Sequence, residues 1–170
     1  MIETTDFIQL QKWLRVKRVS LLTVCLMVVF LQANAKVIFV KAVANGTGAS
    51  WSNAFGDLQQ ALKSAKAGDE IWVAAGVYTP TKNNDRMVSF VIPSGIKVFG
   101  GFAGNETALQ QRNIQSNPTT LSGEIGTISQ EDNSYTIIYT RHAGSDTEID
   151  GFIISGGHAN GIGSIGDIKV

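Results

Sequence analysis

The 170-residue sequence has little cysteine, little proline and little charge. It contains one cysteine, Cys25, and three prolines, and charged residues make up only 16% of it. Cys25 falls in the apolar segment of a predicted leader, so the rest of the chain has neither disulfides nor a cysteine nucleophile. Hydrophobic residues reach 44%, which argues against intrinsic disorder. The 18 glycines are typical of a turn-rich β protein.

The charge balance excludes a nucleic-acid partner. Lysine plus arginine and aspartate plus glutamate both number 14. Four of the basic and two of the acidic residues lie in residues 1–35. Residues 36–170 therefore contain 10 basic and 12 acidic residues. A slightly acidic chain with scattered basic residues lacks the clustered positive charge that binds nucleic acid. The same scatter argues against a basic patch for a membrane surface.

The N-terminus has the three parts of a secretory signal. Residues 1–18 are polar and net positive, residues 19–31 form an apolar run of 13, and Ala33-Asn34-Ala35 provides the small residues of a cleavage site. A permanent transmembrane helix needs about 20 apolar residues, and Val24 before Cys25 does not suit a lipoprotein anchor. We therefore predict a signal peptide over residues 1–35 with cleavage after Ala35. Membrane contact is expected only through the uncleaved signal peptide, and the protein is expected to be secreted or at the outer membrane or cell surface.

The first part of the mature chain, residues 36–67, is predicted to form a strand and a capping helix. Residues 37–40 are β-branched and aromatic, as in a strand. Ser52 or Asn53 is predicted to cap the helix and Gly68 to end it. The apolar stripe of this helix consists of Ala54, Leu58, Ala61, Leu62 and Ala65. Such a lone amphipathic helix is expected to cover the open end of a β structure.

From residue 68 to residue 170 the pattern predicts short strands without a second helix. The expected strands are 71–78, 88–92, 96–102, 119–125, 135–140 and 149–155. A doubly wound fold needs alternating helices and is excluded, which leaves a sandwich, a barrel or a solenoid. Two of the strands run through glycines, at 98–102 and 151–156, and such glycines mark bends between strand faces. The bends favour the solenoid, although the segments are irregularly spaced.

Several motifs in this order resemble a known superfamily. Residues 68–78 (GDEIWVAAGVY) resemble the opening of right-handed parallel β-helix proteins of the pectin-lyase-like superfamily. The preceding residues 51–58 (WSNAFGDL) are similar to the lead-in of exported proteins of the polymorphic outer-membrane type in Gram-negative bacteria. Further matching segments are 100–107 (GGFAGNET), Arg112, 121–125 (LSGEI), 132–135 (DNSY), 150–157 (DGFIISGG) and 159–161 (ANG).

The resemblance implies an all-β fold, a right-handed parallel β-helix (solenoid) with an N-terminal capping α-helix. Residues 68–170 would then be the first coils. Because members of this branch usually continue for many more coils, the chain is expected to be an N-terminal fragment and marginally soluble alone. Relatives in the superfamily include polysaccharide lyases and hydrolases.

No residue is predicted to be catalytic, to bind a cofactor or to hold a metal. A phosphate-binding loop is missing, and the G-x-G-x-x-G match at 161–166 has no helix after it. His142 and His158 lack the spacing of a zinc site. Most acidic residues fall at turns. The nearest approach to a constellation is Glu106, Arg112, Glu124 and Asp132, and Glu106 is expected to pair with Arg112 and pin a long loop.

These observations favour an exported, non-catalytic surface module that acts in adhesion or glycan contact, with an extracellular glycan or a surface protein as partner and no cofactor. One alternative is the N-terminal part of a carbohydrate-active enzyme, a polysaccharide lyase or hydrolase, whose active coils are missing. Another is a truncated fragment without independent function.

Overall fold

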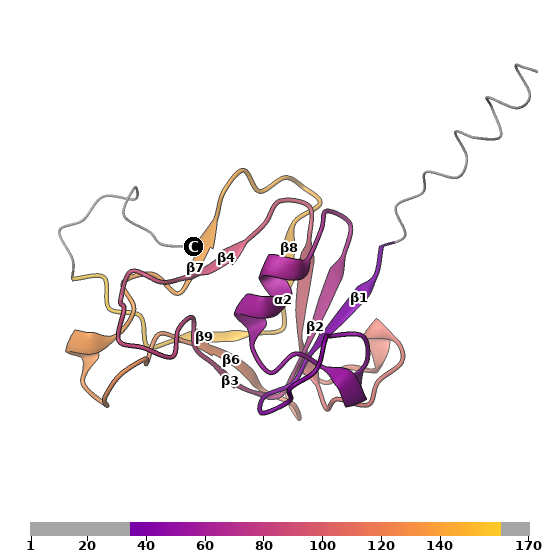
Figure 1. The fold of residues 1–170 in the computed structure, drawn as a ribbon, viewed down its shortest axis with the longest axis horizontal. Coiled ribbons are helices and arrows are strands. Elements are labelled where there is room, and N and C mark those ends of the chain that lie inside the picture. The colour runs from indigo at the N-terminus through magenta and orange to yellow at the C-terminus, as the bar shows by residue number, and fades with distance from the viewer. Residues whose placement is uncertain (1–34, 161–170) are drawn as a thin grey trace, which may run out of the picture. The chain divides into compact units, whose positions relative to one another are not determined.

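The protein is seen in a computed structural model that describes residues 35–160 (Figure 1). The predicted leader, except Ala35, and the G-x-G-x-x-G match at 161–166 lie outside the described residues. Across residues 35–160, none of the helices has the length and apolar character needed to cross a membrane.

Nine short strands and four short helices form within the described residues, and every strand pairing is parallel. The strands are β1 (Val37–Val40), β2 (Glu70–Ala74), β3 (Gly76–Tyr78), β4 (Phe90–Ile92), β5 (Lys97–Phe102), β6 (Thr119–Ser122), β7 (Ile138–Thr140), β8 (Glu148–Asp150) and β9 (Ile153–Ser155). The helices are the α-helix α2 (Leu58–Ser64) and the 3-10 helices η1 (Trp51–Asn53), η2 (Leu109–Gln111) and η3 (Gln130–Asp132). The strand orders are β1-β2-β5-β8, β3-β6-β9 and β4-β7, so three small sheets result.

The expectation of an all-β, right-handed parallel β-helix is therefore wrong. The fold is mixed, with an α-helix that belongs to the core and three small parallel sheets. Solenoids stack units of similar length. Here the in-register positions Val37, Glu70, Lys97 and Glu148 follow one another at intervals of 33, 27 and 51 residues. Long connections that contain helical turns account for the unequal intervals.

Parallel register gives the four-stranded sheet two apolar faces. Ile38, Ile71 and Val98 lie in one cross-strand row and are almost completely buried in the main core. The neighbouring positions Phe39 and Trp72 lie in the next row, and their side chains point to the opposite face because side chains alternate along a strand. Both rows are apolar, so the sheet is covered on both sides.

Helix α2 closes the main core beside β1, β2 and β4. Its predicted stripe is largely confirmed, since Leu58, Ala61 and Leu62 are buried in that core. The predicted cap is wrong: Asp57 is the N-cap, and its carboxylate accepts a hydrogen bond from the backbone N–H of Gln59 at 2.9 Å. Residues before Asp57 cannot join the helix, because Phe55 is extended and bridges to Val40 of β1.

Two predicted strands are each divided between two sheets by a glycine. Residues 71–78 split into β2 and β3 before Gly76, which has a φ of 151°. Residues 149–155 split into β8 and β9 at Gly151, which has a φ of 82°. A Cβ atom on Gly151 would lie 2.7 Å from the carbonyl oxygen of Gly100 on the neighbouring strand. The bend expected in residues 151–156 is thus confirmed at Gly151. Gly76 was not among the predicted bends, and residues 98–102, where a bend was expected, stay within the single strand β5.

A second apolar cluster covers the outer face of the four-stranded sheet. Its buried members are Trp72, Phe99 and Phe102, and the partly buried Trp51 packs against them. The rings of Trp72 and Phe102 are stacked with centroids 4.8 Å apart, and Trp51 meets Phe39 edge-on at 4.8 Å. These aromatic residues are core residues on the outside of a sheet.

We expect both clusters to be needed for stability. Phe102→Ala in the outer cluster and Phe90→Ala in the main core should each lower the free energy of unfolding by about 3–5 kcal/mol, because each removes a fully buried ring. Urea denaturation of purified variants measures this. Ile128→Ala is the control and should change stability by less than about 0.5 kcal/mol, since Ile128 is 98% exposed. A negligible effect of Phe102→Ala would show that the outer cluster is not a core.

Candidate functional site

The segment between β5 and β6, residues 103–118, is fastened over the edge of the outer aromatic cluster. Leu109 of η2 packs against that cluster. The indole N–H of Trp51 donates to the carbonyl oxygen of Glu106 at 2.9 Å. At the far end, the backbone N–H of Asn113 donates to the carbonyl oxygen of Gly101 at 2.8 Å. These contacts hold an irregular segment in one position against the sheet.

Glu106 closes the first turn of this segment. Its carboxylate accepts the backbone N–H groups of Ala103 at 2.6 Å and of Gly104 and Asn105 at 3.0 Å each. Burial raises the pKa of this carboxyl, but the backbone N–H donors outweigh burial and leave its pKa below the ordinary value. Glu106 is therefore a charged structural residue that ties down the turn.

Arg112 pairs with Asp150 of β8 and not with Glu106, so the expected Glu106–Arg112 pair is wrong. Its guanidinium also donates to the carbonyl oxygen of Gly100 at 3.3 Å and lies 5.1 Å from the ring centre of Phe99. The pair forms because the register places Asp150 next to Phe99 on the outer face. Arg112 therefore anchors the segment as expected, but to a different carboxylate.

A shallow hollow of about 430 Å³ opens on this segment. Its lining residues are Leu109, Gln110, Arg112, Asn113, Ile114 and Gln115. Ile114 is 44% exposed. The side chains of Gln110 and Gln115 are exposed and make no hydrogen bond to any other residue in the range 35–160. The hollow thus combines two aliphatic side chains with free amide groups and a fixed guanidinium.

Sequence patterns did not indicate this hollow. Its polar residues are ordinary surface types, and the run from Leu109 to Gln115 has no motif spacing. The feature of this run that could have indicated the hollow is its high content of amide side chains, which both donate and accept hydrogen bonds.

The other residues of the predicted constellation do not join the hollow. No ion pair within the described part of the chain links Arg112 to Glu106, Glu124 or Asp132. Asp132 accepts the backbone N–H of Thr127 at 2.7 Å and its hydroxyl at 2.8 Å, and these bonds lower the pKa of its carboxyl. Asp132 is the last residue of η3, and its bonds to Thr127 give it a structural role.

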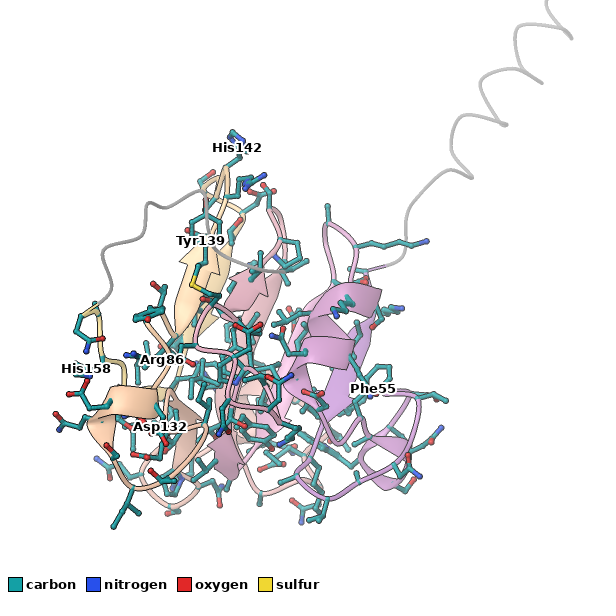
Figure 2. The ribbon with its side chains drawn as sticks, turned by 60° about the vertical axis from the view of Figure 1, so that its left-hand side comes forward. Phe55, Arg86, Asp132, Tyr139, His142 and His158 are labelled. Carbon is teal, nitrogen blue, oxygen red and sulfur yellow. The ribbon has the colours of Figure 1, made fainter. Side chains whose placement is uncertain are left out.

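The two histidines lie far apart, with His158 near Asp132 and His142 beyond β7 (Figure 2). His142 is exposed, and the Nδ1 atom of His158 is 2.7 Å from the carbonyl oxygen of Gln130. Among residues 35–160 no group of three or more His, Cys, Asp or Glu side chains is placed to hold a metal ion.

Arg86 contacts several loops at once, a structural role that the sequence did not indicate. Its guanidinium donates to the carbonyl oxygens of Asn133 at 2.6 Å and His158 at 3.1 Å and to the side chain of Asn160 at 2.7 Å, and it lies over the ring of Tyr135 at 4.0 Å. It joins three loops distant in sequence, which explains why only the tertiary structure reveals it (Figure 2).

Of the predicted cleavage residues, Ala33 lies outside the described residues, whereas Ala35 is exposed, as is Lys36. The Ala35–Lys36 bond is therefore at the surface of the folded part.

Comparison of the chain with protein-family models, with curated proteins and with solved structures finds no match in any of the three. The resemblance to exported proteins of the pectin-lyase-like superfamily therefore stays a prediction from sequence motifs.

We expect Glu106→Gln to lower the free energy of unfolding by about 1–2 kcal/mol at pH 7, because a neutral amide loses the charge-assisted hydrogen bonds. A carboxyl with a lowered pKa in the folded state stabilises above its unfolded pKa and loses this effect as the pH falls through its folded pKa. The difference between wild type and variant should therefore shrink as the pH falls below about 4.5.

Urea denaturation between pH 3 and pH 7 measures this difference. Glu124→Gln is the matched control, since Glu124 is exposed and its side chain accepts no hydrogen bond within the described residues. A difference between wild type and Glu106→Gln that does not vary with pH would contradict the role of the Glu106 charge.

Proposed function

We propose that this chain is an exported, non-catalytic surface protein that contacts a glycan through the hollow on residues 109–115. The observation that supports this proposal is the composition of the hollow. Its lining combines the exposed amides of Gln110 and Gln115 with the exposed aliphatic side chain of Ile114.

The chemistry of sugars supports this choice. A pyranose offers pairs of neighbouring hydroxyl groups, each a donor and an acceptor, and an apolar face of C–H groups. An amide side chain has two donor hydrogens and one acceptor oxygen, which match such a pair. Leu109 and Ile114 supply the apolar surface. Binding sites for small ligands commonly combine an apolar lining with a few well-placed polar groups.

The charge of the hollow favours a neutral glycan. Arg112 is its only cationic lining residue, and its guanidinium is already paired with the carboxylate of Asp150. A uronate or sulfate would have to compete with that pair, whereas a neutral sugar needs only the free amides. We therefore expect neutral polysaccharides to bind better than acidic ones.

The double variant Gln110→Ala/Gln115→Ala should lower affinity for a neutral glycan about tenfold, because it removes two amides that bind hydroxyl groups. A glycan array identifies the ligand and isothermal titration calorimetry measures the affinity. Gln130→Ala is the control and should bind as wild type does, because Gln130 is an exposed glutamine in η3, outside the hollow. A wild-type protein that binds only acidic glycans, or none, would contradict the proposal.

Export is the second part of the proposal and is supported by the three-part leader and by the surface position of the Ala35–Lys36 bond. When the full chain is produced in a bacterium with a secretory system, we expect a mature protein that begins at Lys36. Mass spectrometry of the intact secreted protein measures its N-terminus. Ala33→Asp/Ala35→Asp should block cleavage, because charged residues do not fit a site for small ones. A full-length protein retained in the cytoplasm would refute export.

A further inference from the structure

Asp69 is a buried carboxylate without a cationic partner. Its side chain lies directly before β2 and the residue is only 4% exposed. One oxygen, Oδ1, accepts the backbone N–H of Lys36 at 3.1 Å, and Oδ2 accepts the backbone N–H of Lys66 at 2.9 Å. The ion pairs found in the range 35–160 are Lys97–Glu148 and Arg112–Asp150, so neither includes Asp69.

A buried charge is costly unless a countercharge compensates it. Within residues 35–160 the side chain of Asp69 has two neutral N–H donors and no countercharge. The first of these donors, however, is the nitrogen atom that cleavage after Ala35 would release as the α-amino group of Lys36.

We propose that removal of the leader creates an ion pair between the new α-ammonium group of Lys36 and the carboxylate of Asp69, so that maturation itself stabilises the folded protein. This inference rests on the proposed cleavage after Ala35. In the reaction, water adds its hydroxyl to the carbonyl carbon of Ala35, and the C–N bond breaks. The nitrogen of Lys36 takes the remaining proton of the water and a second proton from solvent to become the ammonium.

The surrounding backbone holds this nitrogen in place. The carbonyl oxygen of Lys36 accepts the backbone N–H of Glu70 at 2.9 Å. The next residue, Val37, begins β1 and is in register with Glu70. Because these contacts come from Lys36 and the residues after it, they persist after cleavage. The ammonium therefore forms within 3.1 Å of the Asp69 carboxylate without a rearrangement.

Other charged groups on the packed elements do not replace the ammonium. The carboxylate of Glu70 accepts the indole N–H of Trp72 at 2.8 Å, and the ammonium of Lys97 lies 3.7 Å from Glu148. The side chains of Lys36 and Lys66 make no ion pair within the described chain.

The pH dependence follows from linkage. An ion pair with Asp69 raises the pKa of the α-ammonium above its unfolded value, which is about 8. The stabilisation is then complete below about pH 8 and is lost as the pH rises through the folded pKa. Burial raises the pKa of Tyr78, which is buried in the main core, to about 12, so Tyr78 does not ionise in this range.

The test uses the secreted mature protein, whose N-terminus is first established by mass spectrometry. Urea denaturation is then measured at steps from pH 7 to pH 10. For wild type we expect the unfolding equilibrium constant to rise about tenfold across this range. Asp69→Asn should abolish most of the rise. Glu70→Gln is the matched control, because it removes a neighbouring carboxylate and should keep the full rise.

A second measurement uses wild type alone, in case Asp69→Asn does not fold. Competitive acetylation with acetic anhydride, read out by mass spectrometry, gives the titration of the α-amino group in the native and the urea-unfolded protein. We expect the α-amino group of Lys36 to react more slowly and to titrate at higher pH in the native protein than in the unfolded protein. An N-terminus other than Lys36 overturns the proposed cleavage. A Lys36 N-terminus that titrates alike in both states overturns the ion pair and leaves the cleavage intact.

Discussion

In-register parallel pairing of β1, β2, β5 and β8 is the constraint on which the rest of the structure depends. Side chains alternate between the faces of a strand, so the register decides as a whole which residues enter the main core and which form the outer aromatic cluster. A slip by one residue would exchange the rows of Ile71 and Trp72. Since both rows are apolar, the sheet has to be covered on both faces, by α2 on one side and by residues 103–118 on the other.

The covering of the outer face creates the candidate site. Glu106 and Arg112 hold residues 103–118 in place, through backbone N–H groups in one case and through Asp150 in the other. The amides of Gln110 and Gln115 remain available to a ligand because they take no part in this fastening. A rigid scaffold with a polar surface segment is a common arrangement for binding. The hollow is thus a consequence of how an apolar outer face is shielded from water.

A second feature related to function is the contact between the backbone of Lys36 and the side chain of Asp69 at the start of the folded part. Lys36 lies just before β1, and Asp69 lies just before β2, the neighbouring strand of the same sheet. Parallel pairing places the starts of both strands at one edge, so the backbone nitrogen of Lys36 lies beside the residue that precedes β2. If the chain is cleaved after Ala35 as proposed, the aspartate at that position couples export to the stability of the fold.

Local sequence patterns alone located the helical stripe of Leu58, Ala61 and Leu62 and the approximate position of every strand, and the leader stays a prediction from the same kind of pattern. These features depend on residues close together in the chain. Long-range contacts decided the rest: the division of strands at Gly76 and Gly151, the mixed fold class in place of a regular β-helix, and the choice of Asp150 as the partner of Arg112. The hollow and the burial of Asp69 are equally tertiary, because an amide or a carboxylate looks the same in sequence whether water or protein surrounds it, and only packing determines which.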